Sequence, residues 1–95
     1  MHLEITHQGA AQRFEAQLEG HLAQCCYRRD GKVLVLHHTE VPPAFEGQGV
    51  AGALVAAALA WARAEGLRVR PTCSYVASYM RRHAETQDLL ETAAR

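Results

Sequence analysis

Apolar and polar residues alternate along the first part of the chain in the way that predicts short β-strands. Leu3 and Ile5 have polar neighbours, and the same pattern returns at Phe14, Ala16 and Leu18. A strand that alternates in this way buries one face and leaves the other face in water. We therefore expect two strands here, joined by a turn that contains a glycine.

The third and fourth strands are predicted from a turn signal and an unbroken apolar run. Residues 21–28 carry apolar side chains on both faces, and residues 32–40 contain the run Val-Leu-Val-Leu. The pair Asp30-Gly31 between them is typical of a tight hairpin. A run without alternation is typical of a strand that is covered on both faces. We therefore expect residues 32–40 at the centre of an antiparallel meander.

In the second half of the chain the spacing of apolar residues becomes that of a helix. Eight alanines lie between positions 51 and 64, and alanine has the highest helix propensity. Residues three or four apart form an apolar stripe on one face: Val50, Leu54, Ala57 and Trp61. Gly66 can adopt the left-handed conformation that ends many helices. We therefore expect a helix over residues 49–65.

A second strand and a second helix complete the predicted fold. Residues 67–72 are predicted as a strand and residues 74–83 as a short helix, whereas the chain from Ala84 onward is poorly specified. A strand–helix–strand unit pairs its strands in parallel with a right-handed connection, so residues 67–72 should lie beside residues 32–41. The expected fold is α+β: an antiparallel meander, a right-handed β-α-β crossover and a short helix. The candidates for inward side chains on that last helix are Tyr75, Tyr79 and Met80.

The length of the chain allows one domain with one core. We expect the 95 residues to form a single domain over residues 1–95, with little left for accessory elements. The central strand, the long helix and the last strand should all contribute to the core. The expected core residues are Leu34, Leu36, Leu54, Trp61 and Val69.

Charge and composition exclude several classes of partner. The 10 Lys and Arg residues balance the 10 Asp and Glu residues, and a chain without basic excess is not typical of nucleic-acid binders. No apolar stretch is long enough to span a bilayer, and the first residues lack the apolar region of a signal peptide. Cys25, Cys26 and Cys73 are odd in number and do not suggest a disulfide framework. We expect a cytoplasmic monomer or weak homodimer with no membrane or nucleic-acid partner.

A glycine-rich turn between the central strand and the long helix is the main candidate for chemistry. A helix N-terminus presents free N–H groups and a partial positive charge, so phosphates bind there readily. Plain chain reversal explains the same glycines. The Walker pattern is excluded because no Gly-Lys-Ser/Thr follows, and a dinucleotide fingerprint would need an acidic residue on the next strand. The turn consists of Glu46, Gly47, Gln48, Gly49, Val50 and Ala51.

This turn resembles the acetyl-CoA-binding motif of the GNAT superfamily of N-acetyltransferases, Gln/Arg-x-x-Gly-x-Gly/Ala. Gly49 and Ala51 match its small positions, and Glu46 stands where Gln or Arg is usual. The segments HTEVPPAFEGQGVAGALV, GLRVRPTCSYVASYMRRH and DLL resemble a small single-domain branch of the superfamily. In that branch a proline follows the histidine near the end, whereas Ala84 follows His83 here.

The resemblance implies an acetyl-CoA-dependent N-acetyltransferase whose acceptor amine is unidentified. In this fold the two parallel strands splay apart, the pantetheine arm of CoA lies between them, and the pyrophosphate lies on the turn. The implied cofactor-binding residues are Thr39, Val41, Glu46, Gly47, Gln48, Gly49, Val50 and Ala51. Other members have helices between their first two strands, but this chain has only a turn. The acceptor site should therefore be open or completed by a partner. A CoA-binding or protein-interaction module with little turnover is the alternative.

Acetyl transfer to an amine is helped by a general base, by an oxyanion donor and by an acid for the leaving thiolate. The catalytic candidates near the expected site are Cys73, Tyr79, Glu40 and His38. Strand alternation places His37 and His38 on opposite faces, so at most one of them faces the cofactor. The resemblance implies that a tyrosine on the last helix protonates the CoA thiolate, and Tyr79 ranks slightly ahead of Tyr75. Core packing explains both tyrosines equally simply.

Cys73 should lie where the last strand ends and the last helix begins. The N–H groups of a helix N-terminus stabilise a thiolate, and open α/β sheets bind ligands at the carboxyl ends of their parallel strands. Cys73 could accept the acetyl group or line the pantetheine channel, or it could be a small buried apolar residue. The spacing of cysteines and histidines does not match a zinc site, so we expect no metal.

Overall fold

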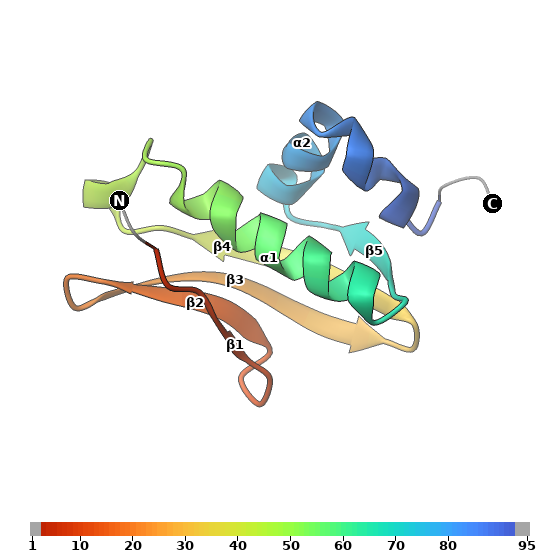
Figure 1. The fold of residues 1–95 in the computed structure, drawn as a ribbon, viewed down its shortest axis with the longest axis horizontal. Coiled ribbons are helices and arrows are strands. Elements are labelled where there is room, and N and C mark those ends of the chain that lie inside the picture. The colour runs from red at the N-terminus through yellow and green to blue at the C-terminus, as the bar shows by residue number, and fades with distance from the viewer. Residues whose placement is uncertain (1–2, 93–95) are drawn as a thin grey trace.

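The computed structural model describes residues 3–92, which form a five-stranded mixed sheet with helices (Figure 1). The strands lie in the sheet in their sequence order, from β1 at one edge to β5 at the other. The elements are β1 (Thr6–Gln8), β2 (Arg13–Leu18), β3 (His21–Asp30), β4 (Val33–Glu40), the 3-10 helix η1 (Pro43–Phe45), α1 (Val50–Ala64), β5 (Arg68–Pro71), α2 (Ser74–Arg82) and the 3-10 helix η2 (Ala84–Leu89). None of the helices in this part of the chain has the length and apolarity needed to cross a membrane.

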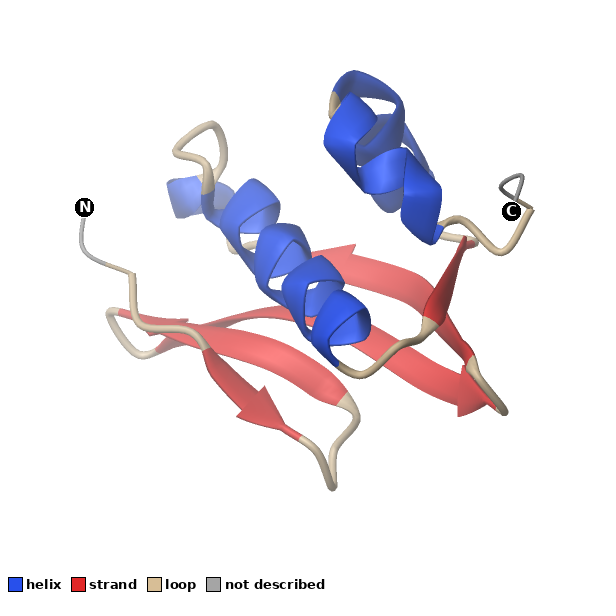
Figure 2. Cartoon of the chain, turned by 45° about the vertical axis from the view of Figure 1, so that its right-hand side comes forward, coloured by secondary structure: helices blue, strands red, loops and turns tan. Residues whose placement is uncertain are grey.

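The meander and the parallel pair expected from the sequence are confirmed. The first four strands pair antiparallel in succession. β4 and β5 pair in parallel, from Val33 opposite Arg68 to Leu36 opposite Pro71. Since α1 connects these two strands and lies across one face of the sheet (Figure 2), the beginning of α1 is brought next to the end of β4.

The first strand lies later in the chain than its apolar alternation predicted. β1 contains only Thr6–Gln8, which pair with β2. Leu3 and Ile5 precede the strand and pack, partly buried, against the core. The apolar alternation of these residues therefore reflects their packing against the core. They do not take part in the hydrogen-bonded pairing of the sheet.

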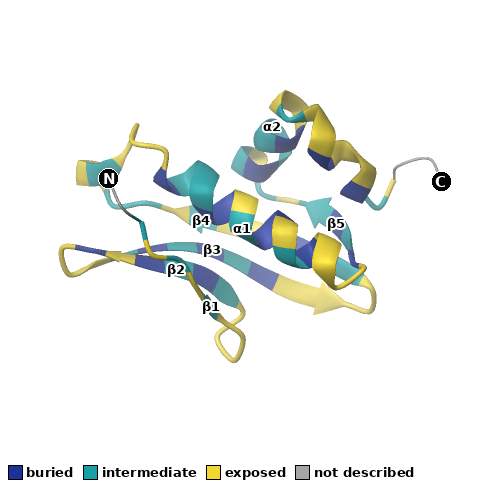
Figure 3. Cartoon of the chain, viewed as in Figure 1, coloured by how far each residue is buried: buried dark blue, intermediate teal, exposed yellow. Residues whose placement is uncertain are grey.

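The core lies between the sheet and α1, and most of its expected members are buried (Figure 3). Leu34, Leu36, Leu54 and Val69 are fully buried, as predicted. Trp61 is only half-buried, so its prediction as a core residue was wrong. Its ring packs at the edge of the core, 4.6, 6.0 and 5.5 Å from the rings of His7, Phe14 and Tyr27, centroid to centroid. The residues of α1 that are buried are Val50, Leu54, Val55, Ala58, Leu59 and Ala62.

On α2, the side chains that are fully buried belong to Val76 and Met80. Met80 was an expected inward residue, whereas Tyr75 and Tyr79 are only partly buried against the core. The helix therefore buries its aliphatic residues and holds both tyrosines at the edge of the core, where their hydroxyl groups can reach other polar groups.

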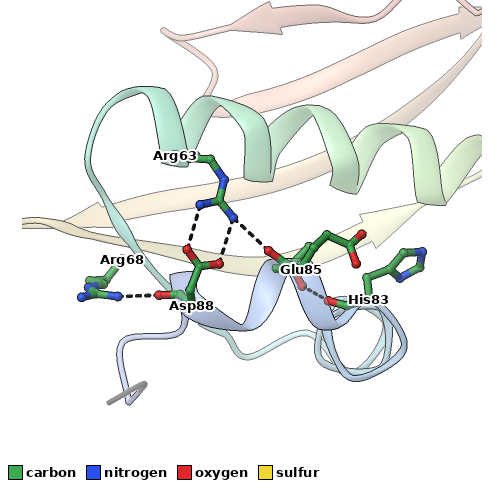
Figure 4. Close-up of polar contacts among 6 residues, drawn as sticks. Arg63, Arg68, His83, Glu85 and Asp88 are labelled. Carbon is green, nitrogen blue, oxygen red and sulfur yellow. Dashed lines mark hydrogen bonds and ion pairs between the residues drawn. The ribbon is translucent and has the colours of Figure 1, made fainter. Parts of the chain in front are cut away.

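The segment after α2 is held against the rest of the protein by arginines (Figure 4). Arg63 of α1 donates two hydrogen bonds to the Asp88 carboxylate, at 2.8 and 2.9 Å, and a third to the Glu85 carbonyl. Arg70 of β5 pairs with Glu91 and with Asp30. Because these partners are 21 to 40 residues apart, no local pattern in the sequence could specify this segment.

Candidate functional site

β4 and β5 separate at Leu36, and this separation opens the site. The N–H groups of Thr72 and Cys73 both donate to the Leu36 carbonyl, at 3.1 and 3.0 Å. The parallel ladder ends there, because β5 turns into α2 while β4 continues to Glu40 beside β3. The last part of β4 therefore has no β5 partner.

A β-bulge in β4 decides which of its side chains face α1. Cys26 pairs with His38 and Tyr27 pairs with Leu36, so His37 is an extra residue in β4. Leu36 lies in the core, and Thr39, three residues later, lies opposite the buried Cys25 and faces the same side. Simple alternation does not hold across a bulge, so the pairing fixes the face of His38 and not that of His37, and both histidines are exposed.

The turn before α1 depends on two glycines with positive φ. Gly47 has φ 81° and Gly49 has φ 82°, a conformation that costs other residues free energy. Gly49 is the N-cap of α1, and no side chain caps the helix start. The first-turn N–H groups therefore have no side-chain partner and remain available to a ligand.

A cavity of about 380 Å³ lies where the turn, the start of α1 and the end of β4 meet. It includes seven of the eight residues that the resemblance implied for the cofactor, and Gln48 is the one that does not line it. Sequence reasoning missed Phe45 and Gly52, and it treated Tyr75 only as a candidate acid. Phe45 is the one aromatic residue between β4 and α1, which is a signal that could have been used. The lining residues are Thr39, Val41, Phe45, Glu46, Gly47, Gly49, Val50, Ala51, Gly52 and Tyr75.

Tyr75 and Tyr79 both approach α1 at Gly52 but face different spaces. A Cβ atom at Gly52 would lie 3.6 Å from the Tyr75 hydroxyl and 3.7 Å from the Tyr79 ring. Tyr75 lines the cavity, whereas Tyr79 lines a second, smaller hollow between α1 and η2 and stacks on His83 with ring centroids 3.9 Å apart. Burial raises the pKa of Tyr79.

Cys73 is the N-cap of α2 and lies beside the end of β4. Its Sγ atom is 3.6 Å from the Thr39 Oγ1 atom. Cys25, which pairs with Thr39 in the ladder, is fully buried, and burial raises the pKa of its thiol to about 12. The Thr39 hydroxyl at the cavity wall therefore lies between the partly exposed thiol of Cys73 and the buried thiol of Cys25.

His38 and Glu40 are not brought to this cavity. They lie on the sheet face opposite Thr39, where His38 Nε2 and Glu40 Oε1 are 3.2 Å apart. The hydrogen bond with His38 and a second from Gln24 hold the pKa of Glu40 below its usual value. Within residues 3–92, no group of three or more His, Cys, Asp or Glu side chains is arranged to hold a metal ion.

The fold and the site have counterparts among known proteins. Residues 13–89 match the model of the GCN5-related N-acetyltransferase family. The chain therefore belongs to this family, which confirms the resemblance found in the sequence and makes N-acetyl transfer its general class of reaction.

Relatives and a solved structure agree with this assignment. Over 90 residues the chain is 34% identical to Protein NATD1 of Gallus gallus and of Homo sapiens, covering 92% of this chain and 82% and 80% of those proteins. The solution structure of a GCN5-like protein from Staphylococcus aureus superimposes with a TM-score of 0.77 at 26% identity. That match covers 98% of this chain and 92% of the other. The α+β fold expected from the sequence is confirmed.

Proposed function

We propose that this chain transfers the acetyl group of acetyl-CoA to an amine and that acetyl-CoA binds in the cavity between β4 and α1. The family generally uses acetyl-CoA. The observation that carries the proposal is the cavity itself, because it joins an uncapped helix start to the end of β4, which has no partner on its β5 side. A volume of about 380 Å³ lies within the range of small-molecule sites, which is roughly 300–1,000 Å³.

The residues around the cavity fit the two ends of the pantetheine arm. The N–H groups of Val50, Ala51 and Gly52 can bind the pyrophosphate at the helix N-terminus. The end of β4, at Thr39 and Val41, has no partner on its β5 side and can bind the amide groups of the arm as a neighbouring strand would.

The acetyl end of acetyl-CoA then lies near Tyr75 and Cys73. Attack of the amine nitrogen on the thioester carbon forms the C–N bond and breaks the C–S bond. The CoA thiolate takes the proton of the Tyr75 hydroxyl, and water takes the proton of the amine. We assign the acid role to Tyr75 ahead of Tyr79 because Tyr75 lines the cavity. We assign no proton transfer to His38 or Glu40, because both lie on the opposite face of β4.

The direct test is to mix purified chain and acetyl-CoA with a panel of amines that includes polyamines, amino-acid amides and lysine peptides. Mass spectrometry of the products should show an acetylated amine and equimolar CoA. Binding of CoA without any acetylated product would favour the alternative, a binding module with little turnover. The four-residue turn between β1 and β2, which leaves the acceptor side open, is the observation that favours this alternative. Absence of CoA binding would contradict both.

Cys73 can take part by accepting the acetyl group. Its thiolate would attack the thioester carbon, CoA would leave as a thiolate that takes a proton from Tyr75, and the amine would then displace the Cys73 sulfur. We expect intact-mass measurement to show one acetyl group on the wild type after mixing with acetyl-CoA, and none on Cys73→Ala. Cys26→Ala is the matched control, because Cys26 is also partly exposed but lies on the other face of the sheet. Unchanged turnover in Cys73→Ala would leave Cys73 as a residue that packs against the core beside the cavity, which it does not line.

Glu46 places a negative charge at the end of the cavity proposed for the pyrophosphate. Glu46→Gln should therefore tighten CoA binding by about two- to fivefold at low ionic strength, because removing a like charge near a helix N-terminus is worth roughly 0.3–1 kcal/mol. Calorimetry at low and high salt measures this, and the gain should shrink as salt increases.

Glu65→Gln is the matched control for this charge, because Glu65 is exposed at the opposite end of α1. It should leave CoA affinity unchanged. Equal or weaker binding by Glu46→Gln would place the phosphates elsewhere.

A further inference from the structure

We propose that Thr39 is a positioning residue whose hydroxyl donates a hydrogen bond to the Cys73 sulfur and holds this sulfur beside the cavity. This inference rests on the proposed function, in which Cys73 lies at the acetyl end of the cofactor. It assigns to the Thr39 side chain a role toward the protein, in addition to its place in the lining of the cavity.

The contact joins two elements that are distant in sequence. Thr39 Oγ1 of β4 and Cys73 Sγ at the start of α2 are 3.6 Å apart, a normal separation for a hydrogen bond to sulfur. The Cys73 N–H donates to the Leu36 carbonyl at 3.0 Å, so β4 holds both the backbone and the sulfur of Cys73. The bulge at His37 makes this possible, because without the extra residue Thr39 would face the other side of the sheet.

The buried thiol of Cys25 influences which sulfur the Thr39 hydroxyl proton points to. Thr39 has one hydroxyl proton and two thiol neighbours, because Cys25 lies opposite Thr39 in the ladder between β3 and β4. Burial keeps Cys25 protonated at neutral pH, so its S–H can donate to the Thr39 oxygen. The Thr39 proton is then free to point to the partly exposed sulfur of Cys73.

The identity of residue 39 matters for two separable reasons. A threonine in a strand has a restricted χ1 angle, which fixes the direction of its hydroxyl. Valine keeps the same shape and removes the donor, whereas serine keeps the donor and removes the methyl group. Thr39→Val and Thr39→Ser therefore separate hydrogen bonding from packing. The other titratable groups at the cavity, Tyr75 and Glu46, are the same in both variants.

The test is the rate at which iodoacetamide alkylates Cys73 between pH 6 and 10 in the full chain without cofactor, a range of roughly two pH units either side of an ordinary thiol pKa. Peptide mapping separates Cys73 from Cys25 and Cys26. We expect Thr39→Val to lower the Cys73 rate about tenfold near neutral pH, because a hydrogen bond to a charged group has about that effect. The rate at the highest pH should stay within about twofold of wild type, because the thiolate then forms without help. Thr39→Ser should restore most of the rate.

If circular dichroism shows that the valine variant does not fold, Thr39→Ala replaces it in the test. Thr39→Ala should show the same loss of the Cys73 alkylation rate near neutral pH. Equal alkylation rates in wild type and in the folded Val or Ala variant at every pH would overturn the inference, as would a loss of equal size in Thr39→Ser. The proposed function has its own test: it is wrong if calorimetry shows that wild-type protein does not bind acetyl-CoA. The alkylation rates are measured without cofactor and do not depend on that result.

Discussion

Replacement of Gly49 by valine is expected to reduce CoA affinity about a hundredfold or more while the chain stays folded. Gly49 has φ 82°, where an L-residue costs about 1–2 kcal/mol and a β-branched one more. The turn would relax away from this conformation and move the first N–H groups of α1. Each lost hydrogen bond to a phosphate costs about 1.5–3 kcal/mol, and every 1.4 kcal/mol is tenfold in affinity.

The valine side chain would also enter space that the protein leaves empty. No atom lies within 4 Å of a Cβ built on Gly49, and Gly49 lines the cavity. Packing within the protein therefore gives no reason for a glycine here beyond its φ. The open space on the cavity side is where we propose that the pyrophosphate lies.

Gly20→Val is the matched control for this change. Gly20 has φ 81°, lies in the turn between β2 and β3, and also has no atom within 4 Å of an added Cβ. Gly20→Val should therefore lower the free energy of unfolding by a similar amount and leave CoA affinity unchanged. Calorimetry on both folded variants decides the matter: if Gly49→Val binds CoA as the wild type does, the phosphates do not bind at the start of α1.

The second large effect is expected at Tyr75. Tyr75→Phe removes only the hydroxyl, and loss of a general acid typically costs about 10²–10⁴ in rate. We expect kcat to fall about a hundredfold, with the affinity for CoA nearly unchanged, because the acid acts only as the thiolate leaves. Steady-state kinetics with the best acceptor from the amine panel, together with calorimetry, measures both.

Tyr79→Phe provides the comparison within the same helix. Tyr79 lies one helical turn later, also contacts α1 at Gly52, and faces the second hollow beside His83. Tyr79→Phe should leave kcat within about threefold of wild type, because Tyr79 is not the general acid in our assignment. Loss of the general acid itself would reduce kcat far more. A larger loss in Tyr79→Phe than in Tyr75→Phe would reverse our assignment of the acid.

The sequence predicts most of the fold because the signals for its elements are local. The Asp30-Gly31 turn, the apolar run of β4 and the alanine-rich helix that ends before Gly66 each depend on residues close together in the chain. The parallel pairing of β4 and β5 follows from the strand–helix–strand order. The glycine turn could be identified for the same reason, since it is one continuous segment, whereas Thr39 and Val41 were implied by the family resemblance.

The remaining features depend on contacts between distant segments. The bulge at His37 arises from the register of β4 against β3, and it decides that Thr39 faces α1 while His38 does not. Trp61 is partly buried at the edge of the core, against aromatic rings of β1, β2 and β3 that are distant from it in the sequence. Thr39 and Cys73 are 34 positions apart in the sequence, and no pattern in either segment predicts their contact.

Amide-resolved NMR of 15N-labelled protein titrated with CoA can show whether CoA binds at the start of α1. We expect saturable shifts of the N–H signals of Val50, Ala51 and Gly52 at the helix start, of Thr39 on β4 and of Val41 directly after β4. His38 and Glu40, on the opposite face of the sheet, should change least among the residues near the site. Saturable shifts confined to that opposite face, or no shifts at millimolar CoA, would mean that CoA does not bind at the start of α1.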